Sequence, residues 1–253
     1  MILTLATLVL SVFGAFIRWL QTRNIIDEVS GLAKSGAGLS VVLVVYSLFV
    51  LAVVVAAAQM IRRRFRTETE ATAALGSESK VPGILLIVFA LVFVIAALLV
   101  MFTADAARFP MMQRIFGACG IFGGLCFPFF LAKRDGTVNP SSRTAAVILP
   151  FFYLFWMVFA YKTNADNPTL WVFAPEMLAL AASTIGVYQV AAYFYGRAKP
   201  TATLIALQLA AYLNIGVLFD RRSIALTLMI AISAALMMVL YYVLVSNLKE
   251  DMD

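Results

Sequence analysis

Apolar residues occur in eight long stretches separated by short polar segments. The stretches cover roughly residues 2–20, 39–60, 82–103, 112–131, 144–162, 169–195, 201–219 and 223–246. A helix needs about 20 apolar residues to cross a hydrocarbon core of about 30 Å, and each stretch approaches that length. The pattern predicts an all-α fold, a polytopic integral membrane bundle of about eight transmembrane helices. Residues 1–253 would form a single transmembrane domain, with no soluble domain.

Turn-forming pairs mark several of the boundaries between stretches. They are Pro82-Gly83, Asp135-Gly136, Asn139-Pro140, Asn167-Pro168 and Lys199-Pro200. Only Asp220-Arg221-Arg222 separates the last two stretches, and we interpret it as a hinge because the combined run is too long for one crossing. The first stretch has no basic residues before it and ends in Arg18-Trp19-Leu20, so we expect a retained helix rather than a cleaved signal peptide.

Composition and charge agree with a location in a membrane. Of the 253 residues, 63% are hydrophobic and only 13% are charged, whereas a soluble domain carries about a quarter charged residues. The net charge of +6 comes mostly from loops, where basic residues orient a membrane protein and contact anionic lipid. We therefore expect the lipid bilayer, and no nucleic acid, as a partner.

The basic run Arg62-Arg63-Arg64-Phe65-Arg66 directly follows the second stretch and is the strongest orientation signal in the chain. Cytoplasmic loops of membrane proteins carry an excess of lysine and arginine. With eight crossings, this rule places both termini in the cytoplasm. The predicted location is the plasma membrane, in a bacterial cell, and the Arg62–Arg66 segment is a candidate docking site for a partner protein.

Among the charged residues inside the stretches, three are candidates for a functional role: Arg18, Arg114 and Glu176. Charged groups at membrane depth are expensive and often functional. The proposed topology puts all three in the outer third of the membrane, which predicts a polar ligand-binding pocket with two guanidinium groups and one carboxylate. Guanidinium groups bind carboxylates and phosphates in a bidentate geometry, so an amino-acid-like zwitterion or a small anion would fit.

A structural interpretation of the same residues stays open. Arg18 would then extend to the interface, and Glu176 would pair with one arginine to join two helices. Ser183 lies two helical turns from Glu176 on the same face and is a further candidate ligand-binding residue. Such polar side chains also form hydrogen bonds between helices in membranes.

The fourth stretch contains glycines at helical spacing. Gly117, Gly120 and Gly124 lie near one face of the predicted helix. Gly120 and Gly124 form a GxxxG pair, which allows two helix backbones to approach closely in lipid. The spacing predicts close helix packing by these three glycines.

Signatures of membrane enzymes are missing from the sequence. The chain has no histidine, and it contains neither a GxSxG nor an HExxH motif. We therefore expect no catalytic residues, no metal site and no cofactor, and we interpret the protein as a non-enzyme.

Two classes of function fit these observations. In the first, the chain is a small-solute permease, or a membrane-embedded substrate-binding subunit, for a small anionic or zwitterionic solute, energised by a partner or an ion gradient. In the second, it is a sensor or scaffold that does not transport and that docks a cytoplasmic or membrane partner. A lipid-modifying membrane enzyme is a distant third. The grouping of Arg18, Arg114 and Glu176 at one depth favours the first class.

Overall fold

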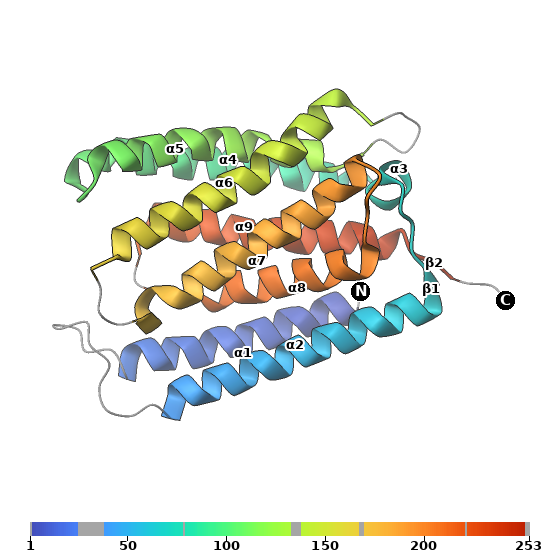
Figure 1. Ribbon diagram of the computed structural model, residues 1–253, viewed down its shortest axis with the longest axis horizontal. Helices are drawn as coiled ribbons and strands as arrows, with labels where there is room; N and C mark the ends of the chain where they lie inside the picture. Colours follow the sequence, from blue (N-terminus) through green and yellow to red (C-terminus); the bar gives the residue numbers. More distant parts are fainter. Residues whose placement is uncertain are drawn as a thin grey trace.

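Long helices lie side by side in the computed structural model (Figure 1). The structure describes residues 2–24, 38–77, 79–132, 138–166, 170–220 and 222–250. The long helices within these ranges are α1 (Ile2–Asn24), α2 (Gly38–Arg64), α4 (Val81–Phe102), α5 (Pro110–Leu125), α6 (Pro140–Asn164), α7 (Leu170–Phe194), α8 (Pro200–Gly216) and α9 (Ile224–Ser246). The short elements are β1 (Phe65–Arg66), α3 (Ala71–Ala74), the 3₁₀ helices η1 (Ala104–Ala106) and η2 (Phe127–Phe130), and β2 (Lys249–Glu250).

Five of the long helices in the described ranges are long and apolar enough to cross a membrane. They are α2, α4, α6, α9, and α7 from Trp171 onward. Helices α5 and α8 have 16 and 17 residues, and at 1.5 Å per residue each is about 25 Å long, shorter than a typical hydrocarbon core. The structure supports a helical membrane bundle, while the number of eight crossings stays a prediction.

Local sequence explains where several helices begin. The side chain of Asn139 accepts a hydrogen bond from the backbone N–H of Ser141 at the start of α6, and Ser223 accepts one from Leu226 at the start of α9. Both are N-cap interactions, which satisfy an otherwise unpaired N–H group. Proline occupies the first turn of α4, α5, α6 and α8, where its missing N–H costs nothing.

Helix α9 has a central place in the bundle. It packs against α4 on one side and α8 on the other, and α1 and α2 pack against α8. Helix α1 begins and α9 ends at the same end of the bundle (Figure 1), which we call the terminal end. We call the other end the opposite end.

The three glycines singled out in the sequence lie where α5 approaches its neighbours. A Cβ atom at Gly117 would lie 2.7 Å from the Cβ of Met101 and 2.8 Å from the carbonyl oxygen of Ala97, both on α4. At Gly124 it would lie 3.0 Å from side-chain atoms of Phe93. At Gly120 it would be 3.0 Å from the Cβ of Ala97 and 3.3 Å from Met229 on α9. Helices α5 and α4 therefore pack backbone to backbone, as the GxxxG pattern predicts.

An aromatic cluster fills the space between α4, α5 and α6. Its rings are those of Phe93, Phe116, Phe152, Trp156 and Phe159. Phe116 and Phe159 stack with their ring centroids 4.2 Å apart, while Phe93 meets Phe152 edge to face. The edge-to-face contact is favourable for aromatic rings, and the five rings together make this half of the bundle a tightly packed core.

The segment between α2 and α4 folds back onto the terminal end. Strand β1 pairs antiparallel with β2. The side-chain amide of Asn247 donates hydrogen bonds to the carbonyl oxygens of Ala74 and Gly76, and Leu75 is fully buried. Arg62, Arg63 and Arg64 remain exposed at the end of α2. The predicted docking of a partner at the Arg62–Arg66 segment stays a prediction.

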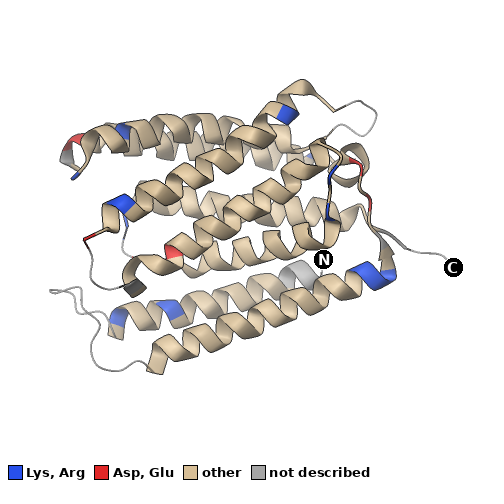
Figure 2. Ribbon diagram, viewed as in Figure 1, with Lys and Arg blue, Asp and Glu red and all other residues tan. Residues whose placement is uncertain are grey.

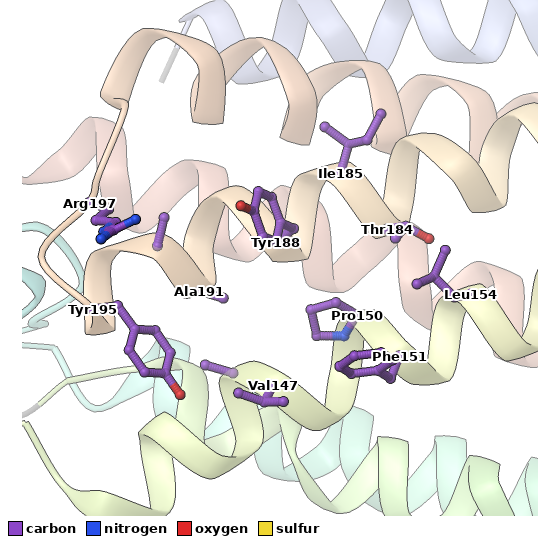
Figure 3. A pocket seen from close by; sticks show the side chains of 12 residues that line it. Val147, Pro150, Phe151, Leu154, Thr184, Ile185, Tyr188, Ala191, Tyr195 and Arg197 are labelled. Atoms are coloured by element: carbon purple, nitrogen blue, oxygen red, sulfur yellow. The ribbon is translucent and has the colours of Figure 1, made fainter.

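Charged residues gather at the two ends of the bundle (Figure 2). The last turn of α2, with its exposed arginines, lies at the terminal end, while Arg18 near the end of α1 and Glu176 near the start of α7 belong to the opposite end (Figure 1). Between the ends, α6 and α7 border a groove on the outer face of the bundle (Figure 3). The orientation of the termini and the plasma-membrane location stay predictions.

Candidate functional site

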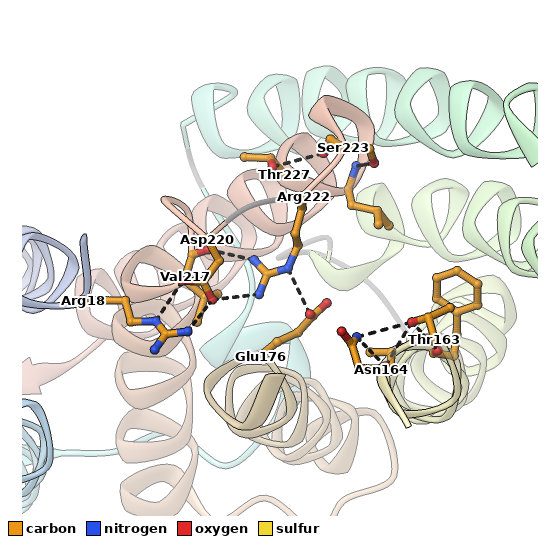
Figure 4. Close-up of polar contacts among 12 residues, drawn as sticks. Arg18, Thr163, Asn164, Glu176, Val217, Asp220, Arg222, Ser223 and Thr227 are labelled. Carbon is orange, nitrogen blue, oxygen red and sulfur yellow. Dashed lines mark hydrogen bonds and ion pairs between the residues drawn. The ribbon is translucent and has the colours of Figure 1, made fainter. Parts of the chain in front are cut away.

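Four charged side chains meet at the opposite end of the bundle, and we call them the four-charge network. They are Arg18 from α1, Glu176 from α7, and Asp220 and Arg222 from the segment that joins α8 to α9. Figure 4 shows them converging from three parts of the fold. All four side chains are at least 92% buried, because their exposed fractions lie between 3% and 8%.

Arg18 is held by several acceptors at once. Its Nε and Nη2 donate to the two carboxylate oxygens of Asp220, at 2.8 and 3.1 Å, the bidentate geometry that suits a guanidinium group. Nη1 donates to the side chain of Gln21 at 2.6 Å, and Nη2 also donates to the carbonyl oxygen of Trp171 at 2.9 Å. Gln21 in turn donates to Ser40 on α2. Arg18 therefore joins α1 to α2, α7 and the α8–α9 segment.

Arg222 connects the two carboxylates of the network. Its Nη2 donates to Asp220 at 3.0 Å and its Nε donates to Glu176 at 2.9 Å. Its Nη1 donates to the carbonyl oxygen of Val217 at 2.8 Å, just beyond the end of α8. A cation at a helix C-terminus is favourable because the unpaired carbonyl groups there are partly negative. Asp220 thus accepts from both arginines, while Glu176 is bound by Arg222.

The network has two positive and two negative charges, so its net charge is zero. Placing four ions in a low-dielectric interior carries a large desolvation cost, and ion pairing recovers it only with good geometry. Every one of the four groups has at least one partner of opposite charge. The four buried ions therefore stabilise one another. A charged ligand that binds here must keep the numbers of positive and negative charges equal.

Polar side chains continue from the network toward the middle of the bundle. Ser183 is fully buried, seven residues from Glu176, and so lies about 10 Å further along α7. The amide nitrogen of Asn214 on α8 donates to Ser183 at 2.7 Å. The amide oxygen of Asn214 is buried and accepts no hydrogen bond from the described residues. Deeper still, Gln208 donates to Thr7 of α1.

The structure places Arg114 apart from Arg18 and Glu176. Arg114 forms an ion pair with Asp105, and the two side chains are 58% and 80% exposed. Helix α5 packs against α4 and α6, whereas Arg18 lies on α1, which packs against α2 and α8. The sequence predicted the same membrane depth for Arg114, Arg18 and Glu176, but Arg114 lies on another part of the bundle. It is not part of the four-charge network.

A pocket of about 400 Å³ borders the network. Its lining includes Arg18 of the network together with Trp171, Pro175, Leu178 and Tyr212. The other lining residues are mostly apolar. Tyr212 forms a hydrogen bond of 2.9 Å with Ser47 across the pocket wall. This pocket could hold the apolar part of a small ligand whose charged part reaches Arg18.

Sequence reasoning assigned Asp220 and Arg222 to a hinge and did not count them as site residues. The feature of the sequence that could have identified them is the shortness of the charged segment between two apolar runs. In so short a segment the charged side chains cannot all extend into water. Their carboxylate and guanidinium groups supply the partners that Arg18 and Glu176 require.

Comparison with known proteins adds no relative. No protein-family model, curated protein or solved structure matches the chain.

Proposed function

We propose that the protein is a membrane-embedded permease, or the substrate-binding subunit of one, for a small zwitterion with an apolar side group. The four-charge network would close the solute path at the opposite end. A partner protein or an ion gradient would supply the energy. The observation that carries this proposal is a buried, electrically neutral network that joins three separate parts of the fold.

Charge balance favours a zwitterion over a simple anion. The carboxylate of a zwitterion can replace Asp220 on Arg18, while its ammonium group binds the released carboxylate of Asp220. The number of buried positive and negative charges then stays equal. A simple anion would leave the network with one more negative than positive charge, because Asp220 would then share Arg222 with Glu176, and this excess buried charge is costly. The apolar pocket beside Arg18 supports an apolar side group on the solute.

Binding can be tested by thermal unfolding of the purified protein in nanodiscs of phosphatidylcholine. Leucine and phenylalanine are the zwitterions, and acetate, inorganic phosphate and butylamine are the single-charge controls. We expect the two amino acids to raise the melting temperature, because a ligand at 100 times its Kd stabilises by about 2.7 kcal/mol. The single-charge compounds should have little effect.

Glu176→Gln separates a binding role from a purely structural one. The glutamine oxygen can still accept a hydrogen bond from Arg222. Arg222 also keeps its hydrogen bonds to Asp220 and to the carbonyl oxygen of Val217. We therefore expect a folded protein with a stability loss of about 1–3 kcal/mol. Asp220 would then be the one carboxylate of the network left to pair with Arg222, so it could not be released to bind the ammonium group, and the stabilisation by leucine or phenylalanine should be lost. Glu70→Gln, an exposed site at the terminal end, is the matched control. The proposal fails if neither amino acid stabilises the unaltered protein, or if Glu176→Gln responds as strongly as the control.

A further inference from the structure

The groove between α6 and α7 has the largest volume of the pockets described here, about 770 Å³. Small side chains form its floor, since Ala146 and Ala191 are buried. Large side chains form its rims, where Phe151 and Tyr188 are 66% and 62% exposed. A volume of this size is in the range of pockets that hold small organic ligands. Its lining residues do not include any member of the four-charge network, and its Arg197 end is 21 residues from Glu176 along the chain.

A charged residue marks one end of the groove. Arg197 lies at the end nearest the loop after α7, and Thr184 and Leu154 lie at the other end (Figure 3). Arg197 is exposed and forms no ion pair with the described residues. The groove is therefore amphipathic along its length, with a cationic end and an apolar body.

The backbone after α7 fixes the position of Arg197. Gly196 has a φ of 65°, which favours glycine because this left-handed conformation is strained for other residues. The N–H of Arg197 donates to the carbonyl oxygen of Ala192, and the N–H of Gly196 donates to that of Tyr193. These two bonds form a Schellman motif. The Tyr195 hydroxyl also donates to the backbone carbonyl of Arg143 at the start of α6, which ties the two helices together at this end.

The length of the groove matches one leaflet of a bilayer. From Tyr195 to Thr184 the lining follows α7 for 11 residues, or about 16 Å at 1.5 Å per residue. Half of a typical hydrocarbon core is about 15 Å. An acyl chain that begins at the level of Arg197 would thus end near the middle of the membrane.

We propose that this groove binds one acyl chain of an anionic phospholipid, whose phosphate group pairs with Arg197. The cationic end of the groove lies at the terminal end, which also has the exposed arginines of α2. Anionic lipids are attracted to basic residues at the membrane surface, and the apolar body of the groove excludes a ligand that is only a phosphate ion. The occupant is therefore a lipid rather than a soluble anion.

The test compares lipids that stay bound to the protein with the lipids around it. The protein is reconstituted in nanodiscs with equal amounts of phosphatidylglycerol and phosphatidylcholine, extracted with mild detergent, and examined by native mass spectrometry. We expect bound phosphatidylglycerol to exceed bound phosphatidylcholine at least threefold. Arg197→Gln should reduce the ratio to near one. Lys199→Gln, an exposed cation two residues away that does not line the groove, should keep it.

A second pair of variants tests the groove itself. Ala192→Phe places a ring in the groove and should remove most of the bound lipid, whereas Ala52→Phe, at an exposed position of α2, should not. Equal retention of the two lipids by the unaltered protein would overturn the proposal. So would equal effects of the two cation variants, or lipid binding that survives Ala192→Phe. Displacement of the lipid by millimolar inorganic phosphate would show an ion site and would also overturn it.

Discussion

Asp220→Asn should destabilise the protein by about 3–5 kcal/mol, the usual loss when one partner of a buried ion pair is removed. Asp220 is the carboxylate that Arg18 and Arg222 share. Its replacement leaves two buried guanidinium groups with Glu176 as the remaining carboxylate of the network. The change is isosteric, so packing should be nearly unaffected and the loss should come from charge. Thermal or denaturant unfolding in detergent micelles measures it.

Asp105→Asn is the matched control for Asp220→Asn. Asp105 also pairs with an arginine, Arg114, but both side chains are largely exposed. Exposed ion pairs contribute about 0–1 kcal/mol because water screens the charges. A similar loss for the two variants would mean that the four-charge network is as solvated as a surface pair, which contradicts its burial.

Trp156→Ala should cost about 3 kcal/mol in the same measurement. The side chain is fully buried and meets Phe93, Phe116 and Phe152. Replacing a large buried aromatic side chain with alanine costs about 3–5 kcal/mol in soluble proteins. The lower end applies here because lipid and detergent give helices an apolar surrounding even when they separate, which leaves mainly the lost packing contacts.

Trp156→Phe should be much milder than Trp156→Ala, below about 1.5 kcal/mol. The indole Nε1–H is buried and donates no hydrogen bond to the described residues. Phenylalanine removes this unpaired donor, which offsets part of the lost volume. A phenylalanine variant as unstable as the alanine variant would show that the N–H group has a partner that stabilises the fold.

The helical elements could be predicted closely because the signal was the length of each apolar run. Helix α9, for example, covers residues 224–246 where the sequence predicted 223–246. The fourth run was less regular: α5 ends at Leu125, and a 3₁₀ helix that contains Pro128 follows. Proline lacks the N–H that a continuing α-helix requires. Composition therefore located the helices, while proline set the end of one of them.

The candidate site was harder to predict because apolar patterns give depth and not lateral position. Arg18 and Glu176 are buried in one network, whereas Arg114, for which the sequence predicted the same depth, lies exposed on another side of the bundle. Asp220 and Arg222 were overlooked because a loop residue between two helices usually reaches water. In the structure, Arg18 of α1 and Glu176 of α7 contact them, and both side chains are buried.

We propose that the four-charge network closes a path to the buried polar residues beneath it. Ser183→Cys, in a background with Cys119→Ala and Cys126→Ala, places a thiol about 10 Å below Glu176. Ser233→Cys is the control, because Ser233 is equally buried but lies away from the network. Its side chain forms a hydrogen bond with Tyr153 between α6 and α9. Both proteins are studied in nanodiscs, so a small charged thiol reagent can reach both faces.

The decisive measurement is the labelling rate of each cysteine with and without Glu176→Gln, which weakens the link from α7 to the network. We expect at least tenfold faster labelling at position 183 in the Glu176→Gln protein, with no change at position 233. Equal rates at position 183 with and without Glu176→Gln would contradict the claim that the network is a gate. Faster labelling at both positions would contradict it as well, because general loosening of the bundle would then explain the result.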